Sequence, residues 1–432
     1  MSHPSPTLAA MALNTPERVT RGSVESYSFA SDQVVRRSLL RRDGNYSETD
    51  LAPATGLHAS SADAAFDLAW LQLASKPEVD SMNGVVRVVR VVDLFAGCGG
   101  LSVGIAEAAR GLGMRMDAVL ANDIEAKTLE IYSANFPEAR IACDPIESLL
   151  DGECGAPPTK GERRFAEGVG QIDLVVGGPP CQGHSDFNNH TRNDDPKNEL
   201  YLRMARFCEI VRPRHVIIEN VPGVERDVGR VAQRTWLRLQ ELGYAVDSGV
   251  VDASRLGVAQ RRKRSITMAS LDVEPSVAEA VEGLEVKPRS VEWAIGDLLE
   301  VRRDRLFDQS PRPNSVTQAR IDFLFDNGLF DLPNSERPDC HRLKEHSYVS
   351  VYGRMHWDKP AQTVTTGFGV MGRGRFVHPS ERRTVTPHEA ARIQFFPDFF
   401  RFDDRARTLL HAVIGNAVPP KLGYALGVHL LR

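Results

Sequence analysis

The chain has 432 residues, of which 42% are apolar and 25% charged, and its formal net charge is −4. These values predict one large or two modest domains of a soluble protein and exclude a polycation. Six cysteines without a C-x-x-C pair exclude a disulfide framework and a zinc site, and no apolar run approaches a membrane span or the core of a secretion signal.

An extension, residues 1–84, begins the chain. Its first 58 residues are rich in Ser, Thr, Ala, Pro and Arg and have little periodic apolar pattern, which predicts a largely flexible tail. One amphipathic helix is expected near residues 59–75, packed onto the main body. The tail also contains two arginine pairs, which we interpret as solvated charges: Arg36, Arg37, Arg41 and Arg42.

Strands alternate with helices from residue 85 to residue 271, beginning with a β-rich run that ends at Leu94. This alternation predicts an α/β fold with a doubly wound, mostly parallel, Rossmann-like sheet. The further predicted strands are residues 118–124, 140–143, 172–176, 215–218, 246–251 and 265–269, with helices that include 101–110, 198–211 and 230–242.

The alternation fails after residue 271. Residues 272–383 contain many Arg, Pro and Gly and few clear elements, which predicts a second, smaller lobe. Helical periodicity returns over residues 384–432, and the apolar end of this segment is expected to rejoin the first domain.

Two neighbouring strand ends carry reactive side chains. One apolar run, residues 173–182, ends in two glycines, two prolines and Cys181, and a second run places Glu219 at the end of its own strand. The carboxyl ends of parallel strands are where open α/β sheets bind ligands. A free cysteine is usually a small buried hydrophobe, but the rigid turn before Cys181 and the acid on the partner strand favour covalent catalysis.

The turn after the first strand, residues 91–104, is rich in glycine. Gly97 and Gly99 allow the backbone to approach a ligand at the positive end of a helix, but the spacing is neither that of a dinucleotide site nor that of a P-loop. Asp123 ends the second strand, where a carboxylate can accept hydrogen bonds from the hydroxyls of a ribose. Asp144 follows the third strand, where a carboxylate could accept a hydrogen bond from the amino group of an adenine. An adenosyl ligand without pyrophosphate therefore fits better than NAD, although either acid can also cap a helix.

Six short motifs follow one another between residues 91 and 420. They are Asp93-Leu-Phe-Ala-Gly-Cys-Gly-Gly100, Gly178-Pro-Pro-Cys-Gln182, Glu219-Asn-Val221, Gln260-Arg-Arg-Lys-Arg264, Thr386-Pro-His-Glu-Ala-Ala-Arg-Ile-Gln394 with Phe396-Pro-Asp398, and Gly415-Asn-Ala-Val-Pro-Pro420. In kind and order they resemble those of the DNA cytosine-5 methyltransferases, which use S-adenosylmethionine. The resemblance implies a catalytic and cofactor-binding domain over residues 85–271, a target-recognition region over 272–383, and a C-terminal segment, 384–432, that returns to the catalytic domain.

The resemblance also implies the chemistry. Cys181 resembles the nucleophile whose thiolate adds to C6 of cytosine, so that C5 can attack a methyl group. Glu219 resembles the acid that binds and protonates N3, and Arg262 and Arg264 resemble the pair that orients the base and the catalytic loop. The target ring has to leave the stack, so the partner is double-stranded DNA from which a cytosine is flipped.

The cofactor residues follow from the same resemblance. The glycine-rich turn would cradle S-adenosylmethionine, Asp123 would hold its ribose, Ile124 would lie against the adenine, and Asp144 would read the adenine amino group. The implied binding residues are Phe95, Ala96, Gly97, Gly99, Gly100, Leu101, Asp123, Ile124, Asp144, Pro179 and Asn416. We further expect a monomer in the cytoplasm, associated with the nucleoid and paired with a restriction or defence nuclease.

Two features depart from the family pattern. His184 stands where the family usually has an aromatic residue, and only residues 299–351 remain as variable recognition sequence. This short stretch predicts a short or degenerate target. Phosphate contacts position a protein without reading bases, and the candidates for them are Arg302, Arg303, Arg305, Arg312, Arg320, Arg373 and Arg375.

Three other functions compete with this interpretation. An RNA (tRNA) methyltransferase of the same fold usually carries a Cys-Phe-Thr motif, which we do not find in the corresponding region. A catalytically silent nucleic-acid-binding regulator typically loses the nucleophile or the acid, whereas Cys181 and Glu219 are both present. A nicotinamide-dependent oxidoreductase would need the missing glycine spacing.

Overall fold

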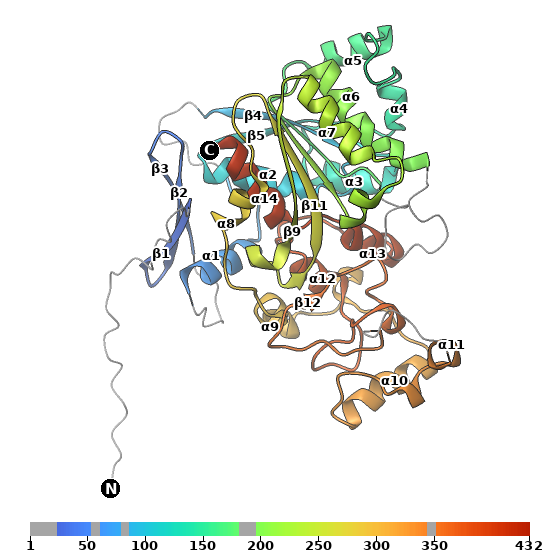
Figure 1. Cartoon of the computed structure of the whole chain (residues 1–432). Helices are drawn as coiled ribbons and strands as arrows, with labels where there is room; N and C mark the ends of the chain where they lie inside the picture. Colours follow the sequence, from blue (N-terminus) through green and yellow to red (C-terminus); the bar gives the residue numbers. More distant parts are fainter. Residues whose placement is uncertain (1–23, 53–60, 79–85, 181–195, 344–350) are drawn as a thin grey trace.

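A seven-stranded sheet forms the centre of the molecule, in the strand order β6-β5-β4-β7-β8-β11-β9 (Figure 1). The computed structural model describes residues 24–52, 61–78, 86–180, 196–343 and 351–432. Strand β11 runs antiparallel to both β8 and β9, and the pairings among the other strands are parallel. The strands are β4 (Val88–Leu94), β5 (Arg115–Asn122), β6 (Arg140–Ala142), β7 (Leu174–Gly177), β8 (His215–Asn220), β9 (Ala245–Asp252) and β11 (Lys263–Ser270).

The predicted α/β fold is confirmed, and the reason lies in the apolar runs. Every residue of β7 and of β8 is buried, as expected for parallel strands covered on both faces. The carboxyl ends of β4, β7 and β8 consequently open at one edge of the sheet, which is where the sequence places its reactive residues.

Helices cover both faces of this sheet (Figure 1). One apolar cluster joins the sheet to α2 (Gly100–Gly111), α3 (Ala126–Asn135), α12 (Pro387–Ile393), α13 (Arg407–Asn416) and α14 (Pro420–Leu431). The other cluster joins it to α4 (Ile146–Leu149), α5 (Lys160–Val169), α6 (Leu202–Val211) and α7 (Val231–Glu241). The C-terminal segment thus returns to the sheet, and α14 packs along α2.

The region after residue 271 divides into two parts. Helices α8 (Val277–Glu282) and α9 (Val291–Ile295) contribute Val277 and Val291 to the main apolar core. A separate small cluster surrounds α10 (Ser315–Asp326) and includes Ile321, Leu324 and Val377. We call the part built on this second cluster the recognition lobe. Short elements of this lobe are η6 (Asn334–Glu336), α11 (Asp339–Arg342) and η7 (Met371–Arg373), whereas η4 (Gly296–Glu300) and η5 (Leu306–Asp308) pack on the main core through Leu298 and Phe307.

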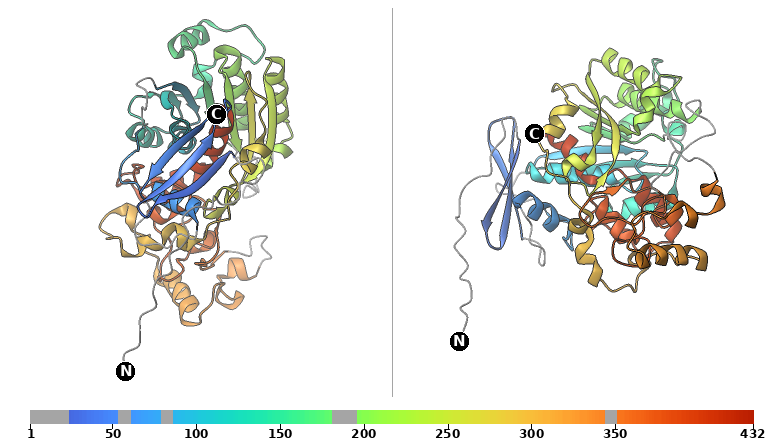
Figure 2. Two further views of the ribbon diagram at one scale, coloured as in Figure 1. Left: turned by 90° about the vertical axis from the view of Figure 1, so that its left-hand side faces the viewer. Right: turned by 60° about the horizontal axis from the view of Figure 1, so that its bottom comes forward.

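The prediction of a largely flexible extension is wrong for residues 25–51. They form an antiparallel sheet in the order β1 (Glu25–Ser31), β2 (Val34–Leu40) and β3 (Tyr46–Leu51). The predicted helix is present as α1 (Ala62–Leu71), and it packs on the main body. We call these four elements the N-terminal unit. Figure 2 shows its strands lying over α14, and Arg42 of this unit donates to the carbonyls of His429 and Arg432.

Candidate active site

The glycine-rich turn runs from the end of β4 to the start of α2. Its backbone takes left-handed conformations at Phe95 (φ 57°), Gly97 (φ 55°) and Gly99 (φ 95°). A positive φ is unusual for a residue as bulky as Phe95, and strain of this kind clusters at ligand sites. The amide of Gly97 donates to Asp123 Oδ2 at 2.9 Å, so the structure brings the predicted turn and the predicted acid together.

The ends of β5 and β6 supply the other predicted cofactor residues. Asp123 Oδ1 accepts from the amide of Glu125 at 3.0 Å, and Asp144 is exposed one strand further along the sheet. Helix capping does not explain either acid, because α3 and α4 begin at other residues and show no side-chain cap. Ile124 follows Asp123 at the end of β5 and is 66% exposed. This edge of the sheet therefore offers an exposed apolar side chain and two carboxylates, which fits the flat face and polar edges of an adenosine.

The remaining predicted cofactor residues surround the same edge of the sheet. Ala96 and Leu101 are buried in the turn and the first turn of α2. The carbonyl of Pro179 accepts from Asn220 Nδ2 at 3.2 Å, which joins the end of β7 to the end of β8. Asn416 is exposed at the end of α13. The C-terminal segment packs directly against the backbone at the start of α2. A Cβ atom added at Gly100 would lie only 2.2 Å from the carbonyl oxygen of Val418, so there is no room for a side chain at this position.

Glu219 lies at the carboxyl end of β8, beside the end of β7. The register pairs Gly177 with Ile218, and Glu219 is 8% exposed. Its Oε1 lies 2.6 Å from Nε of Arg264, and a Cβ built on Gly178 would lie 3.3 Å from its Oε2. One carboxylate oxygen therefore binds Arg264, and the other faces the turn that leads to the predicted nucleophile. Cys181 and His184 both lie outside the described residues.

The two predicted arginines occupy different environments. Arg264 contacts Glu219, whereas Arg262 is 1% exposed and donates to main-chain carbonyls. The distances from Arg262 are 2.9 Å to Val364 O, 3.2 Å to Gly415 O and 2.9 Å to Ala417 O. Arg262 thus connects the strand end to the C-terminal segment that carries Asn416.

Two glutamines inside the sequence motifs strengthen the connection between Arg262 and the C-terminal segment. Gln260 and Gln394 are fully buried, and Gln260 Nε2 donates to Gln394 Oε1 at 2.6 Å. Gln394 in turn donates to the carbonyl of Ile414 at 2.6 Å. A buried amide has to be hydrogen-bonded, so this chain fixes β10 (Gln260–Arg261), α12 and α13 to one another. In the sequence, these two glutamines are marked as functional candidates by their positions inside two motifs.

A buried polar chain lies behind the glycine-rich turn; a sequence motif contains its member Asp93, but the sequence does not indicate the partners of this carboxyl. Ser102 Oγ donates to Asp93 Oδ2 at 2.6 Å and lies 2.9 Å from the hydroxyl of Tyr132. Burial raises the pKa of Asp93 well above its ordinary value, the bond from Ser102 opposes the rise, and the charge of Asp123 adds to it. Burial likewise raises the pKa of the neighbouring Cys98 thiol to about 12, so Cys98 stays a thiol.

The candidate phosphate-binding arginines divide into two groups. Arg303 is paired with Glu381, Arg320 donates to Glu336 O, and Arg375 donates to Phe330 O. In the described part of the chain, the exposed side chains of Arg305, Arg312 and Arg373 make no polar contact. The exposed side chain of Arg302 lies 3.9 Å from Asp304.

No helix in the part of the chain that the structure describes is long and apolar enough to cross a membrane. No group of three or more His, Cys, Asp or Glu side chains in the described ranges is arranged to hold a metal ion.

Comparisons with known proteins place this geometry in a family. The model of the C-5 cytosine-specific DNA methylases matches residues 89–432. The chain is 43% identical to the type II methyltransferase M1.BsuMI of Bacillus subtilis (strain 168), with 95% of this chain and 96% of that protein covered. It is 28% identical to the type II methyltransferase M.AgeI of Thalassovita gelatinovora, with 78% and 98% covered.

The crystal structure of the S. pombe Dnmt2 methyltransferase shares the fold, with a TM-score of 0.56, 21% identity, and coverage of 79% of this chain and 98% of that chain. The chain therefore belongs to the C-5 cytosine-specific DNA methylases and is a DNA cytosine-5 methyltransferase that uses S-adenosylmethionine.

Proposed function

We propose that the enzyme flips a cytosine out of duplex DNA, that Cys181 attacks C6 of this base, and that Glu219 protonates N3. The observation that supports this assignment best is the orientation of the Glu219 carboxylate. Arg264 binds its Oε1 at 2.6 Å, while Gly178, three residues before Cys181, is the neighbour of its Oε2. The contact with Arg264 orients the carboxyl group so that Oε2 faces the strand ends, where its protonated form can serve as a general acid to an entering base.

The proposed steps balance in protons and electron pairs. The thiolate of Cys181 forms a bond to C6, and the proton of Glu219 passes to N3, which leaves C5 electron-rich. S-adenosylmethionine, when bound, would supply an electrophilic methyl group: as C5 bonds to this carbon, the sulfonium–methyl bond would break, its electron pair would stay on sulfur, and S-adenosylhomocysteine would be the leaving group. Loss of the C5 proton to a base and expulsion of the thiolate then give 5-methylcytosine, and Glu219 recovers its proton from N3.

The cofactor residues proposed above meet the chemical demands of an adenosyl group. Gly97 and Gly99 carry no side chain and turn the backbone with positive φ, which allows the chain before the α2 N-terminus to approach a ligand closely. Asp123 and Asp144 offer carboxylate oxygens for the ribose hydroxyls and the adenine amino group, and Ile124 offers an apolar face. Asn416 lies on the segment that Arg262 fixes beside this edge.

We also propose a short or degenerate target sequence, because the recognition lobe is small and its exposed arginines suit phosphates better than base edges. The relatives named as type II methyltransferases support a pairing with a restriction or defence nuclease. We propose action as a monomer on the nucleoid in the cytoplasm, where such a substrate is found.

Bisulfite sequencing of plasmid from cells that express the protein tests these proposals together. Cells that express Cys181→Ala or Glu219→Gln are the controls. We expect protected cytosines in one short sequence context with the wild type, none with Cys181→Ala, and at least about a hundredfold slower methylation with Glu219→Gln. Protection that persists in Cys181→Ala would contradict the nucleophile, and a long, strict context would contradict the proposal on the target.

A further inference from the structure

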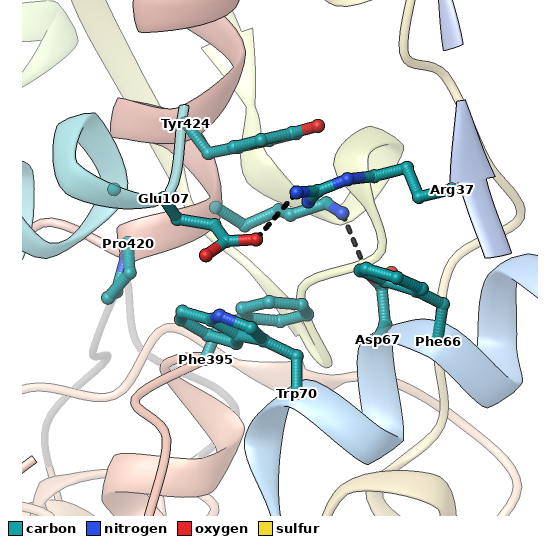
Figure 3. A pocket seen from close by; sticks show the side chains of 10 residues that line it. Arg37, Phe66, Asp67, Trp70, Glu107, Phe395, Pro420 and Tyr424 are labelled. Atoms are coloured by element: carbon teal, nitrogen blue, oxygen red, sulfur yellow. Dashed lines mark hydrogen bonds and ion pairs between the residues drawn. The ribbon is translucent and has the colours of Figure 1, made fainter. Parts of the chain in front are cut away.

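The N-terminal unit contacts the main body through charged side chains that are buried. Arg37 of β2 lies between the rings of Phe66 and Tyr424, with its guanidinium carbon 4.7 Å and 5.0 Å from the ring centroids. Its Nη2 is 2.8 Å from Glu107 Oε1, and the two side chains are 2% and 7% exposed (Figure 3). Strand β2 is thereby joined to α1, α2 and α14 through one side chain.

Other contacts join the same elements. Nζ of Lys421, in the first turn of α14, lies 2.6 Å from Oδ1 of Asp67 in α1. The hydroxyl of Tyr424 donates to Glu25 of β1. Taking paired charges out of water offsets much of their attraction, so buried ion pairs are better evidence for one specified arrangement than for added stability. These pairs hold α14 against α1 and β1, and Arg37 links the same group to α2 through Glu107.

Helices α2 and α14 are the two helices that meet at the proposed cofactor site. The glycine-rich turn leads into α2, and the segment that carries Asn416 leads into α14. Their backbones touch, because a Cβ on Gly104 would lie 2.1 Å from the carbonyl oxygen of Pro420, and one on Gly423 would lie 2.8 Å from that of Leu101. A shift of α14 along α2 would therefore change the distance between the turn and Asn416.

We propose that Arg37 is a positioning residue for cofactor binding. Through Glu107 and Tyr424 it fixes α14 against α2, and this contact sets the spacing between the glycine-rich turn and Asn416. The inference rests on the cofactor site of the proposed function. The segment that the family model matches begins at residue 89, so the N-terminal unit lies outside it. In this proposal the unit acts on the cofactor site through α2 and α14 and does not contact the cofactor.

Calorimetric titration with S-adenosylhomocysteine tests this inference on the full-length protein. The variant Arg37→Met removes the charge and keeps the aliphatic stem. The matched control is Arg36→Met, because Arg36 is the next residue of β2 but points to solvent, where it pairs with Glu48 and Asp50. We expect Arg37→Met to raise the Kd for S-adenosylhomocysteine and the KM for S-adenosylmethionine about tenfold while kcat changes less than twofold. Arg37→Lys should restore part of the affinity, and Arg36→Met should leave both constants unchanged.

A structural role alone would give a different result. If Arg37→Met folds, is less stable, and binds S-adenosylhomocysteine like the wild type, the inference is wrong. If Arg37→Met does not fold, hydrogen exchange in the wild type decides, because coupling between two sites is reciprocal. Saturating S-adenosylhomocysteine should then raise amide protection in β2 and α14, and unchanged protection in β2 would overturn the inference. Failure of the wild type to bind the compound would instead contradict the cofactor site itself.

Discussion

The N-terminal unit and the recognition lobe both attach to the catalytic domain and both contain several arginines, and one arginine of the first and two of the second lie in opposite environments. In the N-terminal unit, Arg37 is 2% exposed and paired with Glu107. In the recognition lobe, Arg312 and Arg373 are exposed and contact no acid in the part of the chain that the structure describes. Buried, paired arginines determine how elements of one protein pack, whereas exposed arginines without partners are available to a polyanionic substrate.

The largest expected effect is on stability, and it concerns the N-terminal unit. Glu107→Ala leaves the guanidinium of Arg37 buried without its nearest carboxylate. Removal of one partner of a buried ion pair typically costs about 3–5 kcal/mol, and we expect a loss of free energy of unfolding in this range by urea denaturation. The control is Glu48→Ala, since Glu48 is a half-exposed partner of Arg36, and it should cost less than about 1 kcal/mol. Equal losses in the two variants would remove the contrast between buried and exposed pairs.

The second prediction concerns pH. Burial by itself raises the pKa of Glu107, but Arg110 and Arg37 outweigh it and hold the pKa at about 2, below the ordinary 4.5. A carboxyl whose pKa is depressed by folding stabilises the fold above its ordinary pKa, and this stabilisation is lost as the pH falls towards the folded value. The difference in free energy of unfolding between the wild type and Glu107→Gln should therefore shrink as the pH falls from about 4.5 to about 2. A difference that stays constant over this range would show that Glu107 is not held as an anion.

The smallest effect is expected at the recognition lobe, and on DNA binding alone. Arg312→Ala and Arg373→Ala should each weaken binding to duplex DNA several-fold, equally for all sequences, and lower the salt dependence by about one counterion. Fluorescence anisotropy over a range of salt concentrations measures both quantities. The control is Arg115→Ala, because Arg115 is exposed at the amino end of β5, away from the strand ends that carry the site. A change of specificity with no change in salt slope would mean that these arginines read bases.

The catalytic sheet could be predicted from sequence because its central strands β4, β7 and β8 are mostly apolar. The positions of Glu219 and Asp123 could be predicted because they stand at the ends of predicted strands. The N-terminal sheet could not be predicted, because several of its inward positions are polar or charged. Strand β3 alternates regularly, but it buries Ser47 and Thr49 beside Leu51, and β2 buries Arg37 between Val35 and Leu39. A polar side chain at an interior position satisfies its bonds through partners distant in sequence, and no local pattern records them.

The same distinction applies to the site: local sequence predicts where a residue lies, but not which residues distant in sequence contact it. The strand ends placed Glu219 and Asp123 where the motifs predicted them. The different environments of Arg262 and Arg264 could not be foreseen, because the carbonyls that bind Arg262 belong to residues more than a hundred positions away, such as Val364. The predicted division into domains and the roles of the site residues stay predictions, which the experiments above address.

The hydrogen bond from Arg42 to the carbonyl of Arg432 joins residues 390 positions apart. During synthesis on the ribosome, β2 emerges long before α14, so Arg37 has no Tyr424 to pack against until translation has passed residue 424. The N-terminal strands, which bury few apolar side chains of their own, therefore complete their fold late. A nascent chain is thus unable to form the complete helix pair before α14, more than 300 residues after α2, has been made.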